Sequence, residues 1–172
     1  TAAANTLDVL FDGVALTGFE GGTIAGVESV TADMLGGTDA LSYVGTAAHV
    51  TVDLVAGTAS GFTAIAGIEN VTGGTGNDTM TGGAGANVLS GGGGNDQFIA
   101  TVNDGNDTYS GGTGTDTYDL SRIAADGVII TTTSATGAAI GSDTLSSIEN
   151  IIGSQANDTI TLAAGVNIID GQ

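Results

Sequence analysis

A nine-residue repeat rich in glycine and aspartate is the feature that most constrains the fold of this chain. From Gly73 the sequence reads GGTGNDTMT, GGAGANVLS and GGGGNDQFI, and after Ala100 and Thr101 it continues as VNDGNDTYS and GGTGTDTYD. Two further units, GSQANDTIT and LAAGVNIID, begin at Gly153 and Leu162. Position six is aspartate or asparagine in every unit, and position eight is large and apolar. Such a fixed period is typical of repeat architectures, in which each unit packs against its neighbours.

The nonapeptide divides into six loop residues and three strand residues. Glycines at positions one, two and four permit a positive φ, and the short strand presents one apolar side chain, at position eight, to a thin interior. Two units make one turn of 18 residues, and neighbouring turns lie about 4.8 Å apart. Alternating residues at Val50–Leu54 and Val128–Thr131 predict two more strands, and no segment predicts a helix. The sequence therefore predicts an all-β fold, a parallel β-roll (a right-handed β-helix or solenoid) with flanking degenerate β-roll modules.

The charge balance narrows the choice of partners. Nineteen acidic residues face a single basic one, Arg122, and the formal net charge is −18. Self-repulsion on this scale opposes compaction, and clustered carboxylates without basic partners indicate divalent cations. Nucleic acid is excluded as a partner on electrostatic grounds. No apolar run approaches the roughly 20 residues of a membrane helix, so we expect no membrane span.

The stacked loops have the chemistry of a calcium site. Stacking places the position-six carboxylates in a row beside backbone carbonyls, and Ca²⁺ takes about six to eight oxygen ligands. Magnesium fits less well because it prefers a tighter octahedron and retains its waters. The sequence therefore predicts several bound Ca²⁺ ions.

These repeats resemble the repeat-in-toxin (RTX, hemolysin-type) calcium-binding family, whose pattern is GGxGxDxUx with U a large apolar residue. Gly73–Thr81 and Gly111–Asp119 match every defined position. The resemblance implies one ion between loops 18 residues apart, held by the position-six carboxylates of both loops and by carbonyls of positions one to four. It also implies export by a type I secretion system and a secreted, extracellular or cell-surface location.

The resemblance places two sites along one edge, between the loops that end at Asp78 and Asp96 and between those that end at Asp96 and Asp116. On the opposite edge Asn87 and Asp107 would pair, although Asn87 carries no charge and glycines are missing from the second loop. The metal ligands predicted in this way are Gly73, Gly74, Thr75, Gly76, Asp78, Gly82, Ala84, Gly85, Asn87, Gly91, Gly92, Gly93, Gly94, Asp96, Asp104, Gly105, Asp107, Gly111, Gly112, Thr113, Gly114, Asp116, Asp158, Glu69 and Glu149.

Glu69 and Glu149 stand in the aspartate position of two longer segments that align with each other. One segment runs from GGTDALSY at Gly36 to GIENVTGGTGNDT, and the other from GGTGTDTYDL at Gly111 to SIENIIGSQANDT. These two glutamates either reach an ion or cap the roll, and the sequence leaves both readings open. We expect three parts: a degenerate β-rich repeat module at 1–63, a calcium-binding nonapeptide β-roll at 64–119, and a second β module at 120–172 that runs into further repeats.

Catalysis is not expected of these residues. His49 is the only histidine and accompanies no serine or cysteine motif, and the repeat acids all occupy calcium positions. Tyr109 and Tyr118 stand at position eight, which favours core packing over ligand stacking.

The predicted function is calcium-induced folding of a non-enzymatic module in a secreted protein. The alternative is a self-assembling extracellular structural protein, such as a surface-layer, filament or adhesin subunit, because open roll ends can stack. The sequence stops inside what looks like a new repeat, so a fragment of a longer chain is one interpretation.

Overall fold

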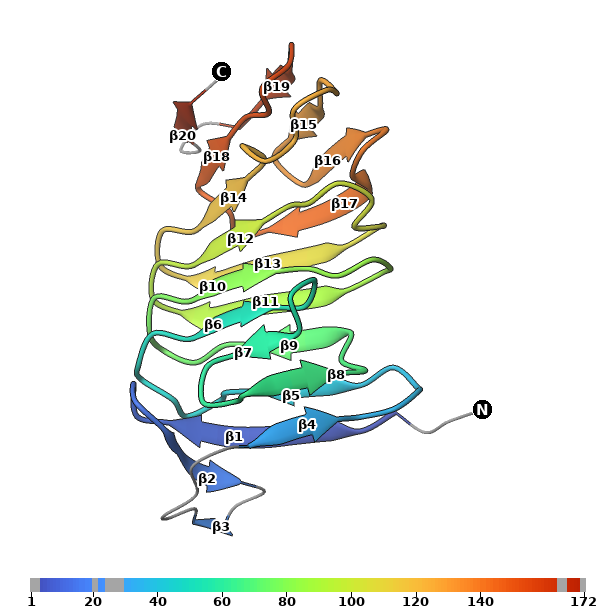
Figure 1. Ribbon diagram of the computed structural model, residues 1–172. Helices are drawn as coiled ribbons and strands as arrows, with labels where there is room; N and C mark the ends of the chain where they lie inside the picture. Colours follow the sequence, from blue (N-terminus) through green and yellow to red (C-terminus); the bar gives the residue numbers. More distant parts are fainter. Residues whose placement is uncertain (1–3, 20–21, 24–29, 164–166, 171–172) are drawn as a thin grey trace.

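The computed structural model describes residues 4–19, 22–23, 30–163 and 167–170, and this part of the chain is all β. The described residues contain no helix, and thus none of the length and hydropathy that a membrane span needs. Short strands stack as successive rungs from the N-terminal to the C-terminal end of the molecule (Figure 1). The expected all-β fold class is confirmed.

Two open sheets and one separate strand pair contain these strands. In spatial order the larger sheet runs β19 (Thr159–Thr161), β15 (Ile129–Thr131), β16 (Ser134–Gly137), β17 (Gly141–Ser146), β13 (Thr108–Thr113), β11 (Val88–Gly93), β9 (Asn70–Thr72), β5 (Ala40–Ser42), β1 (Thr6–Phe11), β2 (Leu16–Phe19) and β3 (Gly22–Thr23). The smaller sheet runs β20 (Asn167–Asp170), β18 (Asn150–Ile152), β14 (Thr117–Asp119), β12 (Gln97–Ile99), β10 (Thr79–Thr81), β6 (Thr51–Asp53) and β7 (Thr58–Ala59). The strand pair consists of β4 (Thr31–Asp33) and β8 (Ala64–Ala66).

From β9 to β14 the chain alternates between the two sheets at every strand. Each strand pairs in parallel with the next strand but one, so that β9, β11 and β13 are neighbours in one sheet and β10, β12 and β14 in the other. Val71 is aligned with Leu89, and Leu89 with Tyr109. Two repeat units therefore separate neighbouring strands of one sheet, as the nine-residue period predicts.

The core lies between the sheets because a three-residue strand turns only its middle side chain inward. Position-eight residues from both sheets, among them Leu89, Phe98, Tyr109 and Tyr118, are fully buried. The ring of Tyr109 lies 5.6 Å from that of Phe98 and 4.9 Å from that of Tyr118 between centroids, which joins the two sheets. The prediction that both tyrosines pack in the core is confirmed.

The 18-residue spacing between paired strands does not hold along the whole stack. Thr108 is aligned with Thr144 and Thr117 with Asn150, and the acids that precede these strands are 36 and 33 residues apart. The inserted chain includes β15 and β16, which pair antiparallel because only two residues connect them. The parallel pairing expected of a β-roll is thus present from β9 to β14, whereas β15 with β16, β16 with β17 and β6 with β7 pair antiparallel.

Adjacent residues of β11 provide a test of this core. Leu89 is fully buried, whereas its neighbour Val88 is 50% exposed. We expect Leu89→Ala to lower the free energy of unfolding by about 2–5 kcal/mol through the lost contacts and the cavity, and Val88→Ala by less than about 0.5 kcal/mol. Denaturant unfolding of both variants in saturating calcium measures the difference. Equal losses of unfolding free energy in the two variants would contradict the assignment of Leu89 to the core-facing side of β11.

Candidate metal centre

Acidic side chains form a continuous row along one edge of the stacked turns. We call this row the first file; its members are Asp78, Asp96, Asp116 and Glu149. Asp78 donates its backbone N–H to Asp96 Oδ1 at 2.7 Å, and Asp96 donates in the same way to Asp116 Oδ1 at 2.7 Å. Asp116 N–H continues to Glu149 Oε2 at 2.9 Å. Each carboxylate therefore ties its own loop to the preceding turn.

A second file follows the other edge, with the same type of bond at every step except that between Glu69 and Asn87; its members are Asn5, Asp39, Glu69, Asn87, Asp107 and Asp143. Asn87 N–H donates to Asp107 Oδ1 at 2.8 Å, and Asp107 N–H to Asp143 Oδ1 at 2.9 Å. The amide Nδ2 of Asn87 donates to the carbonyl of Glu69 at 2.8 Å. The expected pairing of Asn87 with Asp107 across this edge is therefore present.

Four buried carboxylate oxygens have no hydrogen-bond partner within the part of the chain that the structure describes. They are Asp39 Oδ2, Asp96 Oδ2, Asp104 Oδ1 and Asp116 Oδ2. A buried ionised oxygen without a partner is costly, and a cation or a proton must compensate it. These oxygens are the strongest structural indication that the loops bind cations.

Position-one glycines bring these oxygens next to the carbonyls of the following turn. A Cβ at Gly91 would collide with Asp96 Oδ2 and would lie 2.7 Å from the carbonyl oxygen of Gly111. A Cβ at Gly111 would likewise collide with Asp116 Oδ2 and with the carbonyl oxygen of Ser147. The absence of a side chain therefore leaves a small space bordered by a carboxylate and a carbonyl, which are the hard oxygen donors that Ca²⁺ prefers.

Within the described ranges, no three His, Cys, Asp or Glu side chains converge as a metal-binding cluster. An ion in these loops would therefore take most of its ligands from backbone carbonyls, as the repeat pattern implies. The residues of the first file fit such an ion because a carboxylate oxygen and a carbonyl oxygen lie together beside each of Gly73, Gly91 and Gly111.

The three glycine loops of the first file lie directly on one another. A Cβ at Gly92 would collide with the carbonyl of Gly74, and one at Gly94 with that of Gly76. Gly94 also has a φ of +102°, which a residue with a side chain rarely adopts. The structure therefore brings together these predicted first-file residues: Gly73, Gly74, Thr75, Gly76, Asp78, Gly91, Gly92, Gly93, Gly94, Asp96, Gly111, Gly112, Thr113, Gly114 and Asp116.

The predicted residues of the opposite edge meet less closely. A Cβ at Gly82 would lie 3.1 Å from Asn87 Oδ1 and 3.2 Å from Asp107 Oδ2. Gly85 N–H donates to the carbonyl of Asp104 at 2.8 Å, and the backbones of Gly85 and Gly105 are in close contact. Ala84, by contrast, is exposed.

Asp158 is a predicted ligand outside both files, and its bonds match those of Asp78, whose Oδ1 accepts the Val50 N–H at 2.8 Å and whose Oδ2 accepts the Gly74 N–H at 2.8 Å. Asp158 Oδ2 accepts the N–H of Ser154 at 2.8 Å, and its Oδ1 accepts the Ser154 hydroxyl at 2.6 Å and the Val128 N–H at 2.8 Å. Both of its oxygens are thus satisfied within the protein. The loop of the last repeat unit, at residues 162–167, lies partly outside the described residues.

Asn5 and two acidic file members, Asp39 and Asp143, are absent from the predicted ligands; the two acids are the buried side chains that the sequence analysis missed. Both are buried, and each stands two residues before a buried leucine, Leu41 or Leu145, as Asp96 stands two before Phe98. An aspartate two residues before a large apolar residue was the sequence signal that could have identified both. The loops before Asp39 and Asp143 do not follow the glycine pattern of the repeat, so the signal was missed.

Burial raises the pKa of several file carboxylates in the ion-free chain. It raises the pKa of Asp96 to about 6, and the nearby Asp78 and Asp116 add to this. It also raises the pKa of Asp104 to about 7, with Asp143 and Asp107 nearby, and that of Asp143 to about 6. The Tyr118 hydroxyl donates to Asp143 Oδ2 at 2.5 Å, which opposes the rise. Near neutral pH these groups favour either a proton or a cation.

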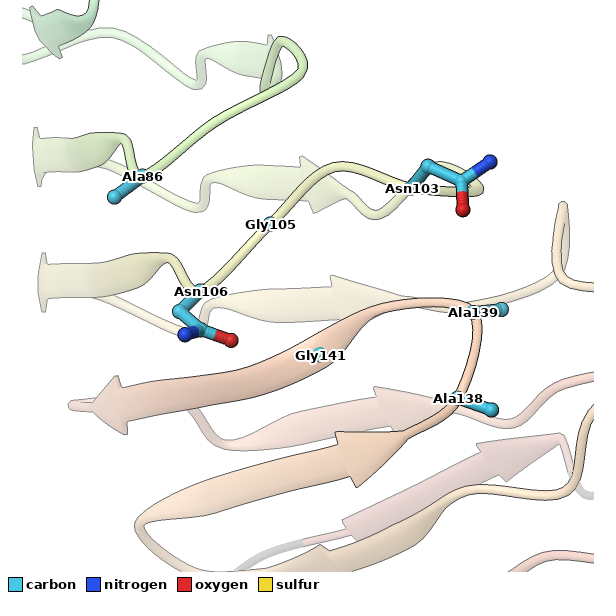
Figure 2. Close-up of a pocket in the computed structure, with 7 residues that line it drawn as sticks. All are labelled: Ala86, Asn103, Gly105, Asn106, Ala138, Ala139 and Gly141. Carbon is cyan, nitrogen blue, oxygen red and sulfur yellow. The ribbon is translucent and has the colours of Figure 1, made fainter.

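A pocket of about 430 Å³ opens at the edge between the loop that precedes β13 and the turn between β16 and β17 (Figure 2). It is lined by Ala86, Asn103, Gly105, Asn106, Ala138, Ala139 and Gly141. The lining has no ionisable side chain, and Gly105 is its only member among the predicted ligands.

A sequence model of the RTX calcium-binding nonapeptide repeat matches the chain in four copies, at residues 63–98, 101–118 and 143–172. The matched residues include both files apart from Asn5 and Asp39. A search among curated proteins finds none that matches the chain.

The raised pKa values predict how the ion-free chain responds to pH. Between the ordinary aspartate pKa of 3.8 and the raised values of about 6 for Asp96 and about 7 for Asp104, the folded chain binds more protons than the unfolded chain. Stability without calcium should therefore rise as the pH falls from 7 to 5. Circular dichroism in a chelator at both pH values measures the β content. A fold that weakens on acidification over this range would contradict the prediction.

Proposed function

Because the chain carries RTX calcium-binding nonapeptide repeats, we propose that it is a non-catalytic module that folds as it binds several calcium ions between its stacked loops. The observation that supports this most strongly is the set of buried carboxylate oxygens, in the files and at Asp104, that have no hydrogen-bond partner among the described residues. The proposed arrangement is a parallel, right-handed β-roll with degenerate β modules at 1–63 and 120–172 on either side of the repeats at 64–119.

Three sites would lie along the first file. Asp78 Oδ2, which also accepts the Gly74 N–H at 2.8 Å, lies with the carbonyl of Gly91 next to Gly73, and Asp96 Oδ2 lies with the carbonyl of Gly111. Asp116 Oδ2 and the carbonyl of Ser147 repeat the arrangement one turn later. The resemblance would add further carbonyls from positions one to four of each loop. A site on the second file would use Asp104 and Asp107.

Electrostatics explains why folding would depend on the ions. The chain carries a net charge of −18 and only one lysine or arginine, so no set of basic side chains can neutralise the buried acids. An ion that binds the folded chain and not the unfolded chain stabilises folding by mass action. The acids in the files are thus held together only when cations lie between them.

This dependence suits a protein that leaves the cell. Calcium-poor cytosol would keep the anionic chain unfolded, and extracellular calcium would trigger folding after export. We therefore propose a secreted, extracellular or cell-surface location and export by type I secretion machinery, as the repeat family implies.

Chelation tests the proposal directly. We expect the chain to lose most of its β signal in a chelator at pH 7 and to recover it in millimolar Ca²⁺, with Mg²⁺ a poor substitute because it retains its waters. Circular dichroism follows the signal, and size exclusion of the calcium-bound form distinguishes a monomeric module from a self-assembling structural subunit. A β spectrum unchanged by chelation would refute calcium-dependent folding.

A pair of alanine variants tests where the central sites lie. Asp96 is the middle of the first file and borders two sites, whereas both oxygens of Asp158 are occupied by Ser154 and Val128. Asp96→Ala should raise the calcium midpoint of folding on the order of tenfold and lower the Hill slope, and Asp158→Ala should raise the midpoint less. Calcium titrations followed by circular dichroism compare the two. Equal shifts would mean that the central sites lie elsewhere.

A further inference from the structure

Asp39 is a fully buried aspartate that lies outside the residues matched to the repeat. It immediately precedes β5, near the N-terminal end of the stacked rungs (Figure 1). Its Oδ1 accepts the backbone N–H of Asn5 at 2.7 Å, and its Oδ2 has no hydrogen-bond partner among the described residues. An aspartate buried in this way without compensation would destabilise the fold.

Asp39 and Glu69 repeat the geometry of Asp116 and Glu149. Asp39 N–H donates to Glu69 Oε2 at 2.8 Å, as Asp116 N–H donates to Glu149 Oε2 at 2.9 Å. The carbonyl of Asp39 accepts the N–H groups of Glu69 at 3.1 Å and Asn70 at 2.9 Å. The carbonyl of Asp116 accepts those of Glu149 and Asn150 at 3.0 Å and 2.8 Å. Two segments that only partly share the repeat sequence thus form the same set of three hydrogen bonds.

The free oxygen is also equivalent in the two files. In Asp96 and Asp116, Oδ1 accepts a backbone N–H from the preceding turn, and Oδ2 is buried without a hydrogen-bond partner among the described residues. The two oxygens of Asp39 differ in the same way. Arg122 is the only lysine or arginine in the chain and is exposed in the loop between β14 and β15, far along the sequence from Asp39. Among the described residues, no basic side chain donates a hydrogen bond to Asp39 Oδ2.

We propose that Asp39 and Glu69 form an additional divalent-cation site, of the oxygen-ligand type that Ca²⁺ prefers, between the turn before β5 and the turn before β9. The inference rests on the proposed calcium binding and extends it beyond the matched residues. It assigns Glu69 to ion binding rather than to a cap alone.

The site would also control the attachment of the first strand. Asn5 donates both its backbone N–H and its Nδ2 to Asp39 Oδ1, at 2.7 and 3.2 Å, and β1 pairs in parallel with β5 directly after these contacts. An ion on Asp39 would hold the carboxylate ionised and in place. The ordering of β1 should therefore depend on calcium although β1 contains no repeat.

Ion counting by native mass spectrometry in Ca²⁺ tests the site. Asp39→Asn preserves the shape of the side chain and removes its charge, and we expect it to bind one ion fewer than the wild type. Asp12→Asn removes the same charge from an exposed aspartate and serves as the matched control. In saturating Ca²⁺, hydrogen exchange of Asn5–Phe11 should be faster in Asp39→Asn than in Asp12→Asn.

The outcomes separate this inference from the proposed function. If the wild type binds no calcium, the proposed function fails; if the wild type binds calcium and Asp39→Asn retains as many ions as Asp12→Asn, only the additional site is refuted. Should Asp39→Asn fail to fold, Glu69→Gln decides, because glutamine can still accept the Asp39 N–H through its amide oxygen. An unchanged ion count in Glu69→Gln would then overturn the site.

Discussion

The fold of this chain depends on a carboxylate that serves two partners at once. In each file, one oxygen of an acid accepts the backbone N–H of the equivalent residue in the preceding turn, as Asp96 does for Asp78. In Asp39, Asp96 and Asp116 the other oxygen is buried without a hydrogen-bond partner among the described residues. The first bond links neighbouring turns, and the second oxygen is the one that a cation would compensate under the proposed function.

This arrangement explains the composition of the chain. Glycine is required at position one because a Cβ at Gly91 or Gly111 would occupy the space beside the file carboxylate. Basic residues are almost absent, so lysine and arginine side chains cannot neutralise the acids, and under the proposed function cations would do so. Between the files, the contacts of Tyr109 with Phe98 and Tyr118 provide a core that needs no ion.

The two files also show that neighbouring turns can be separated by different lengths of chain and still form the same hydrogen bond. Acids that are 18 residues apart at Asp78 and Asp96 are 36 apart at Asp107 and Asp143, yet the hydrogen bond between them is the same. The extra chain forms an antiparallel hairpin beside the parallel strands and does not separate the turns. A rung is thus defined by the acid and the buried residue two positions later, not by a complete nonapeptide.

The sequence alone determined the all-β class, the inward position of residues such as Tyr109, and the alignment of Asp78, Asp96 and Asp116, because these follow from a local period of nine. It did not indicate Asp39 or Asp143, which the structure places in the second file. The residue with which a file member forms its hydrogen bond depends on the length of the chain inserted between the two turns. A local sequence pattern does not give that length. Only the tertiary structure decided which turns lie next to each other. It therefore also decided which buried carboxylate oxygens have no hydrogen-bond partner among the described residues.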